Sequence, residues 1–319
     1  ALHNVVMDKI LLVGGAGFLG YNLLDFVQKQ SVDAPEIVVL SQEIPESSIQ
    51  FPDVIFVAGD YSDANLLRHL FEKHQFTHVF HFASSIIPAL STQNIQADVE
   101  TNLLPTIGLM EVMKAFGCTQ IVYLSSGGAV YGNEEPSHKK EDQACQPISS
   151  YGIIKLAVEH YIRLYAHLYQ IDYLILRLSN PFGLHHRSDT QGVINIAIRK
   201  ALKGETFVVW GDGSQAKDYL FAEDIAKAIL QLMNTQVKNQ TINIGSGQTL
   251  SLVQIIELVK QRIPHFQVEF VEAMPTDVQQ VSLDISKLNS MIPFTLSPLT
   301  DAIEKTFAYE KARLSSLRE

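Results

Sequence analysis

Short apolar runs alternate with longer segments of helical periodicity through the first half of this chain. The runs are rich in β-branched residues and nearly continuous in hydrophobicity, as strands buried on both faces are. They predict strands at Lys9–Val13, Glu36–Leu40, Val54–Ala58, His78–Phe82, Gln120–Leu124 and Asp172–Leu178. Helices are predicted between most of them, at Leu19–Gln30, Ala64–His74, Ala97–Gly117 and Ser150–Tyr169. This alternation predicts an α/β fold with a doubly wound parallel sheet and helices on both faces.

The second half of the chain loosens this alternation. Asn180–Asp189 is expected to be loop-like, and a strand is predicted at Thr206–Trp210. Helices are predicted at Gly192–Leu202, Glu223–Met233, Ser251–Arg262 and Pro298–Ala312. The 319 residues, of which 46% are hydrophobic, suffice for about two domains with cores of their own. We expect one domain over 1–178 and a smaller C-terminal α/β substrate domain over 179–319, with part of about 220–246 packing back on the first.

Composition excludes several classes of function. The 24 basic and 34 acidic residues give a net charge of −10 without a basic stripe, which argues against a nucleic-acid partner. The sequence contains no run of 18 apolar residues, so no membrane span is predicted. The apolar stretch Ile10–Val13 leads into glycines and not into a signal-peptide cleavage site, so a cytoplasmic protein is expected. The two cysteines form no CxxC pair and the eleven histidines no HExxH pattern. No metal site is therefore expected.

A glycine-rich segment, GGAGFLG at Gly14–Gly20, joins the first strand to the first helix. Glycines at this spacing allow a tight turn, close approach of the backbone to a pyrophosphate and close helix–strand packing. The anion then lies at the amino end of a helix, where free amides favour negative charge. In this context the loop predicts a Rossmann-type dinucleotide site formed by Gly14, Gly17, Phe18, Leu19 and Gly20. A plain glycine turn is the alternative.

The ends of the second and third strands bear on which dinucleotide binds. NAD sites usually carry an acid after the second strand, where this chain has Ser41, whose hydroxyl can still bond a ribose. No Arg or Lys for a 2′-phosphate occurs from Ser41 to Tyr61, so NAD is favoured over NADP. Asp60 follows the third strand and is expected either to accept a hydrogen bond from adenine or to act as a helix cap or turn residue.

Tyr151 and Lys155 are spaced i,i+4 at the start of a predicted helix, so their side chains share one face. A lysine ammonium near a phenol favours the phenolate and lowers its pKa. Tyr151 is therefore a candidate general acid/base. By itself the pair could equally be an exposed helical pair.

Seven motifs follow one another along the chain: GGAGFLG, GDYSD, HFASS, SSGGAVYG, YGIIK, LRLSNPFG and WGDGSQAKDYLFAEDIAKAI. In this order they resemble the extended short-chain dehydrogenase/reductase family, and most closely its NAD-dependent sugar-nucleotide epimerases and dehydratases such as the UDP-glucose 4-epimerases. The resemblance runs from about Lys9 to Leu288. It implies that Tyr151 is the acid/base and that Lys155 orients the nicotinamide ribose.

The same resemblance implies the other binding residues and a homodimer. Asp60 and Tyr61 would contact adenine, and the end of the fourth strand would line the cofactor through Phe82, Ala83 and Ser84. Asn102 would support the active-site loops, and Asn180 would meet the nucleotide sugar. The nucleotide-binding side of the second domain would hold Asp218 and Tyr219. The homodimer would form through the helices that carry Asn102 and Tyr151.

The chain departs from this family at the catalytic hydroxyl. The Ser/Thr expected four residues before the Tyr of VYG is replaced by Gly127. We expect Ser126 to take its place, with Ser125 or a water as alternatives and a strand-end cap as the other role for Ser126. The two acids of many 4,6-dehydratases are replaced by Gly128 and Ala129, which argues against elimination chemistry.

Two arginines expected to hold the diphosphate are also replaced, by Lys217 and Met274. Lys217 is the predicted diphosphate ligand, and Arg187 is an alternative cation together with His185 and His186. For the two histidines an exposed polar loop is the favoured interpretation.

The sequence thus predicts an NAD-dependent nucleotide-sugar 4-epimerase, with a UDP-hexose as substrate and a 4-keto intermediate. A reductase or decarboxylase acting on a keto or uronic sugar nucleotide is the first alternative. A non-catalytic NAD-binding regulatory homologue is the second.

Overall fold

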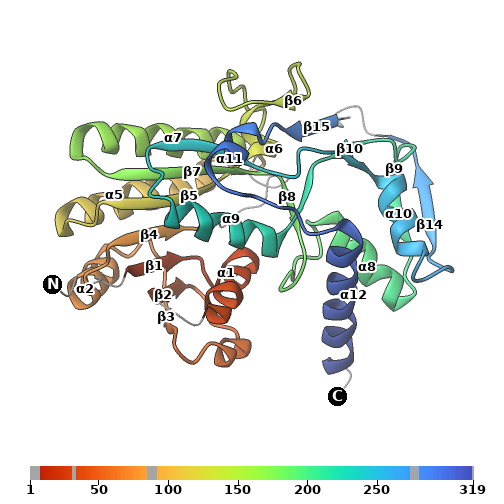
Figure 1. Ribbon diagram of the computed structural model, residues 1–319, viewed down its shortest axis with the longest axis horizontal. Helices are drawn as coiled ribbons and strands as arrows, with labels where there is room; N and C mark the ends of the chain where they lie inside the picture. The colour runs from red at the N-terminus through yellow and green to blue at the C-terminus, as the bar shows by residue number, and fades with distance from the viewer. Residues whose placement is uncertain (1–7, 31–33, 85–91, 274–279, 318–319) are drawn as a thin grey trace.

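The computed structural model describes residues 8–30, 34–84, 92–273 and 280–317. Its larger body is built on a seven-stranded sheet in the order β12-β7-β5-β4-β1-β2-β3, with every neighbouring pair parallel (Figure 1). The strands are β1 (Lys9–Val13), β2 (Glu36–Ser41), β3 (Ile55–Ala58), β4 (His78–His81), β5 (Gln120–Ser126), β7 (Asp172–Leu178) and β12 (Gln240–Ile244). The predicted α/β fold with a doubly wound parallel sheet is confirmed.

Helices cover both faces of this sheet and bury two hydrophobic cores. One core lies under α2 (Ala64–His74), α5 (Leu104–Phe116) and α7 (Ser150–Tyr169). The other lies under α1 (Phe18–Lys29), α9 (Ala222–Asn234) and α11 (Ser286–Met291). Successive residues of β1 alternate between the two cores, Leu11 facing one and Leu12 the other. Burial on both faces explains the continuous hydrophobicity of the central strands.

The segment that carries α9 and β12 returns to this sheet after the chain has left it. β12 pairs with β7, with Ile244 opposite Leu178, and α9 packs against α1. The sequence analysis did not identify β12 as a strand, because QTINI mixes polar and apolar residues in a strand that closes one edge of the sheet.

The smaller part of the molecule is centred on α8 (Val193–Lys203), α10 (Leu252–Lys260) and α12 (Leu299–Ser316). It also contains β9 (Phe207–Trp210) and β14 (Val268–Val271), which pair with each other as a parallel two-stranded sheet. A four-stranded sheet contains β13 (Leu250–Ser251), β10 (Ala216–Lys217), β15 (Gln280–Leu283) and β6 (His138–Lys139). Among the helices of the described segments, none is both long and apolar enough to cross a membrane.

The expectation that Asn180–Asp189 is entirely loop-like was wrong. It begins as β8 (Asn180–Phe182), which pairs with β11 (Tyr219–Phe221). The partner strand lies almost forty positions away, so local periodicity carries no sign of the pairing.

The single helix expected over Ala97–Gly117 is instead three pieces. α4 (Ile95–Asp98) passes into one π-helical turn, η2 (Val99–Leu103), before α5 begins. Pro105 has no N–H, so the helix cannot make its normal bond to the Thr101 carbonyl. That carbonyl accepts a hydrogen bond from the Tyr61 hydroxyl at 3.3 Å instead. π-helical turns of this kind occur often at functional sites.

Candidate functional site

The glycine loop between β1 and α1 is closed against the end of β4. Gly14 has φ +78°, and a Cβ there would lie 2.7 Å from the backbone nitrogen of Ala83. A Cβ on Gly20 would lie 2.2 Å from the carbonyl oxygen of Gly15. Only glycine permits both the turn and the close packing of α1 on the loop.

The amino end of α1 is open to an anion. Gly17 caps the helix without a side-chain hydrogen bond, and the first turn has no acidic residue. The first-turn amides, those of Phe18, Leu19 and Gly20, are therefore available to a pyrophosphate. The Ser41 hydroxyl accepts a hydrogen bond from the Ala16 amide at 3.1 Å, so it fixes the loop, and its contact with a ribose stays a prediction. These residues fit a dinucleotide.

Asp60 and Tyr61 lie beside this loop, at the end of β3. The Asp60 carboxylate accepts from the Ser62 amide at 2.9 Å and from the Gln42 amide at 3.2 Å, which makes Asp60 a turn residue. The cap of α2 is Asp63, so the helix-cap alternative for Asp60 was wrong. Contact of Asp60 and Tyr61 with adenine stays a prediction.

Five of the predicted catalytic and cofactor residues lie together at the carboxyl ends of β4 and β5. A cavity there is lined by Ala83, Ser84, Asn102, Tyr151 and Lys155, and Phe82 precedes it with its ring stacked on Phe80. The Lys155 ammonium lies 5.6 Å from the centroid of the Tyr151 ring and donates to the Leu124 carbonyl at 2.8 Å. The lining includes residues that the sequence analysis did not single out, namely His81, Asp98, Thr106, Tyr123 and Ile154. The position of Asp98 one helical turn before Asn102 was the available signal.

Burial, and not the lysine, dominates the protonation of Tyr151. Removal from water raises the pKa of Tyr151 to about 12, a hydrogen bond with Ser126 lowers it, and the charge of Asp98 raises it. Burial lowers the pKa of Lys155 to about 8, against the charges of Glu159 and Asp98, which raise it. The expectation of a lowered pKa for Tyr151 was therefore wrong, because desolvation of the phenol is the largest effect and raises its pKa.

Of the two serines before Gly127, only Ser126 reaches Tyr151. The Ser126 hydroxyl acts on Tyr151 and lowers its pKa. Ser126 occupies the N-cap position of α6 (Gly127–Val130), but its side chain makes no cap hydrogen bond, so the side-chain cap expected as its other role is not formed. The Ser125 hydroxyl instead donates to the Glu159 carboxylate at 2.7 Å.

The place of the missing hydroxyl is filled by another side chain. A Cβ on Gly127 would lie 2.6 Å and 2.8 Å from the two Cδ atoms of Leu283 and 3.2 Å from the Leu178 carbonyl oxygen. Leu283, in β15, packs on Val130 and Tyr131 and is 1% exposed. The glycine and the leucine thus form one packing unit.

A buried ion pair beneath this site was missed by the sequence analysis. The Glu159 carboxylate is fully buried and receives the Arg177 guanidinium at 2.7 Å and Arg163 at 3.0 Å. Glu159 lies one helical turn after Lys155 on α7, and its buried negative charge raises the pKa of the lysine.

The predicted substrate residues lie on the strands that join the two parts of the molecule. The Asn180 amide donates to the Asp218 carbonyl at 2.9 Å, and the Lys217 side chain is exposed. The Asp218 carboxylate accepts from the amides of Ser246, Gly247 and Leu283, so it clamps three segments together. Tyr219 follows it in β11, half-buried. Met274 lies outside the described residues, and the contacts of Asn180 and Lys217 with a substrate stay predictions.

The two histidines after β8 are not in an exposed loop, and that expectation was wrong. His185 is 8% and His186 4% exposed. His185 bonds Asp25 of α1 at 2.5 Å, and His186 packs edge-on to Phe18 with ring centroids 5.1 Å apart. Burial and the neighbouring Arg199 lower the pKa of His186 to about 4, so it is not a cation at neutral pH. Arg187 is exposed and donates to Ser47 at 3.0 Å.

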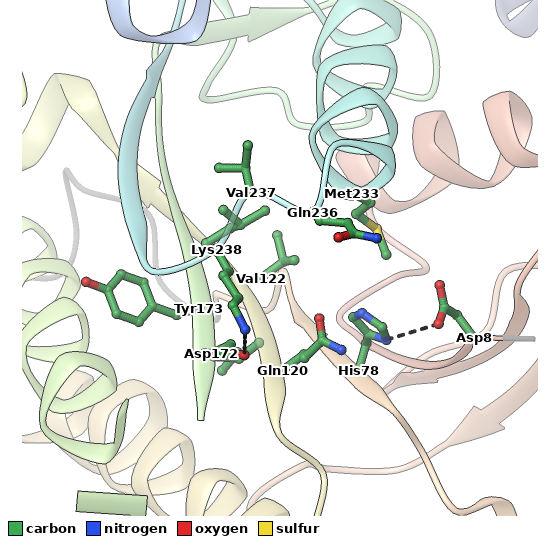
Figure 2. Close-up of a pocket in the computed structure, with 12 residues that line it drawn as sticks. Asp8, His78, Gln120, Val122, Asp172, Tyr173, Met233, Gln236, Val237 and Lys238 are labelled. Carbon is green, nitrogen blue, oxygen red and sulfur yellow. Dashed lines mark hydrogen bonds and ion pairs between the residues drawn. The ribbon is translucent and has the colours of Figure 1, made fainter. Parts of the chain in front are cut away.

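A cavity of about 450 Å³ lies at the opposite end of the large sheet, where β4, β5 and β7 begin (Figure 2). Lys238 is paired there with Asp172 at 3.0 Å, and His78, whose pKa is lowered by burial, lies 3.9 Å from the Asp8 carboxylate. Ligands of open parallel sheets bind at the carboxyl ends of the strands, so this cavity does not belong to the Tyr151 site.

Comparison with known proteins agrees with this geometry. The family model of the NAD dependent epimerase/dehydratase family matches residues 10–245. A putative UDP-glucose 4-epimerase of Methanocaldococcus jannaschii is 35% identical over 291 residues, covering 88% of this chain and 92% of its own. A dTDP-4-dehydro-6-deoxyglucose reductase of Escherichia coli is 28% identical, covering 88% and 90%.

Among solved structures, the UDP-glucose 4-epimerase of Thermotoga maritima with UDP-glucose superposes with a TM-score of 0.89. It is 26% identical and covers 96% of this chain and 99% of its own. The residues matched by the family model include the glycine loop, Tyr151 and Lys155 of this chain. The chain belongs to the NAD-dependent epimerase/dehydratase family.

Proposed function

We propose that this chain is an NAD-dependent nucleotide-sugar 4-epimerase whose substrate is a UDP-hexose. The observation that carries the proposal is the meeting of Tyr151, Lys155 and the Ser126 hydroxyl at the strand ends nearest the glycine loop. The two relatives named as UDP-glucose 4-epimerases support the choice of sugar nucleotide.

Each of these side chains has a role in moving the proton of the sugar 4-hydroxyl. Tyr151 takes this proton and later returns it, since a phenol hydroxyl can act as a general acid and, once ionised, as a general base. Ser126 holds the phenol and the sugar oxygen by hydrogen bonds, and the Lys155 ammonium binds the nicotinamide ribose. NAD held by the glycine loop and Lys155 would supply the hydride chemistry at carbon 4, and its positive charge would favour the phenolate.

The absence of acids at positions 128 and 129 separates this chemistry from dehydration. Elimination across the sugar requires a proton donor and a base beside the catalytic hydroxyl, and Gly128 and Ala129 supply neither. On the substrate side, Lys217 binds the diphosphate as a point charge and Asn180 contacts the sugar nucleotide.

The test is turnover of a panel of UDP- and dTDP-hexoses by purified protein with NAD, followed by chromatography of the sugars. We expect interconversion of 4-epimers without net NADH release, and a loss of at least about 100-fold in Tyr151→Phe with NAD binding retained. Net consumption of NADH or NADPH would instead support a reductase, as the Escherichia coli relative is named. NAD binding without any turnover would support a regulatory homologue.

A further inference from the structure

A buried carboxylate that the proposed chemistry does not use lies beside the Tyr151 site. Asp98, the last residue of α4, is 1% exposed and lines the same cavity as Tyr151 and Lys155. An ionised carboxylate so far from water is costly unless its oxygens are bonded and its charge serves a neighbour.

Both oxygens of Asp98 are bonded, and each bond fixes a part of the site. One oxygen accepts the Ser150 hydroxyl at 2.7 Å, and Ser150 is the first residue of α7, directly before Tyr151. The other accepts the Asn102 amide at 2.9 Å, across the π-helical turn. Asp98 therefore ties the first turn of the catalytic helix to the turn that carries Asn102.

The charge of Asp98 also reaches the two groups that move or hold protons. It raises the pKa of Tyr151 and that of Lys155, while burial lowers the pKa of Lys155 to about 8. Without the carboxylate, the lysine would lose its proton at a lower pH, and so would the phenol.

Among the other groups around the pair, Glu159 on α7 is also charged. It raises the pKa of Lys155 more than Asp98 does and is held by two arginines, whereas the charge that raises the pKa of Tyr151 is that of Asp98. The neighbours from the other elements are uncharged at neutral pH, since burial lowers the pKa of His81 to about 3, raises that of Tyr61 to about 12 and raises that of Tyr123 well above its usual value. They come from β4, β5 and the turn after β3.

We infer that Asp98 is a positioning residue for the Tyr151–Lys155 pair: its two hydrogen bonds hold the start of α7 against the turn of Asn102, and its buried charge lies in the same cavity as the lysine ammonium and the tyrosine phenol. The inference rests on the proposed function for its kinetic consequence. Its electrostatic part concerns the protein alone.

The decisive variant is Asp98→Asn, because an amide can accept from Asn102 or Ser150 at its oxygen while carrying no charge. With the fold kept and the charge removed, both limbs of the pH profile of kcat should move to lower pH by roughly one pH unit. Above the wild-type optimum, kcat should then be about tenfold lower than in the wild type at the same pH, and below the optimum it stays equal or rises. Asp98→Ala removes the bonds as well and should lower kcat at every pH.

A matched control is Asp224→Asn, on α9. Asp224 is 4% exposed and also holds a serine hydroxyl, that of Ser297 at 2.7 Å. It should lower stability without moving the pH profile. An Asp98→Asn profile that falls by one factor at every pH, with unmoved limbs, would reduce Asp98 to a structural residue and overturn the inference.

A second readout does not depend on the substrate. The near-ultraviolet absorbance of phenolate, in each protein minus its Tyr151→Phe counterpart, follows the ionisation of Tyr151 alone. In Asp98→Asn the ionised fraction at a fixed alkaline pH should rise about tenfold if the pKa of Tyr151 falls by about one. If wild-type protein turns over no sugar nucleotide, the proposed function fails while this titration still decides the inference, and an unchanged ionised fraction refutes it.

Discussion

Adding a single methyl group at Gly127 tests whether the lost hydroxyl position is truly closed. In Gly127→Ala the new Cβ would lie 2.6 Å and 2.8 Å from the Leu283 methyl carbons and 3.2 Å from the Leu178 carbonyl. The methyl groups of Leu283 can rotate away, but the Leu178 carbonyl belongs to the backbone of β7 and cannot move without shifting that strand. Overpacking of this kind costs about 1–3 kcal/mol.

Leu283 supplies the second arm of the experiment. Leu283→Ala leaves a cavity that costs about 2–5 kcal/mol by itself. If the two positions are one packing unit, Gly127→Ala should cost less in the Leu283→Ala background than in the wild type, with a coupling energy of about 0.5–3 kcal/mol.

The assay is urea unfolding followed by circular dichroism for the four proteins of this cycle. Gly128→Ala is the matched control in the same short helix, because its Cβ would meet nothing closer than the Ser126 hydroxyl at 4.0 Å. It should leave the free energy of unfolding unchanged or raise it slightly. Equal stability of Gly127→Ala and wild type, or strict additivity in the cycle, would refute the packing argument.

Three further predictions concern other parts of the molecule. Arg177→Met leaves Glu159 buried with one arginine fewer and should lower the free energy of unfolding by about 3–5 kcal/mol in urea, whereas a cost under about 1 kcal/mol would contradict a buried ion pair. The pKa of His186 falls from 6.5 to about 4 on folding, so the unfolded chain binds a proton at a higher pH than the folded protein does. The stability that neutral His186 contributes is therefore complete above pH 6.5, and it is lost on acidification toward pH 4 at up to about 1.4 kcal/mol per pH unit. His186→Gln should flatten the dependence of the urea midpoint on pH over this window, and an unchanged slope would show that another group titrates. The predicted homodimer would use the exposed apolar face of α7, so Leu164→Glu, at a side chain 45% exposed, should give a monomer in light scattering; wild-type protein that is already monomeric would rule out this interface.

The strand ends that form the site could be predicted because local rules govern them. Periodicity placed β1, β7, α2 and α7 at their observed bounds, since strands buried on both faces leave an apolar run and amphipathic helices a 3.6-residue repeat. The glycines of the loop, and Tyr151 and Lys155 one helical turn apart, follow from spacing along a single element. The family motifs added the prediction that the residues after β4 line the cofactor, and the structure places one of them, Ala83, against Gly14.

Contacts between distant segments decided the rest. The sequence determined the α/β class, the glycine loop and the i,i+4 spacing of the predicted acid/base pair, because each depends on neighbours within a short stretch of chain. Tertiary structure alone decided that Ser126 and not Ser125 acts on Tyr151, that Leu283 fills the place beside Gly127, and that burial raises the pKa of Tyr151. Those outcomes depend on desolvation and on side chains brought together from β5, α7 and β15, and no local pattern encodes either.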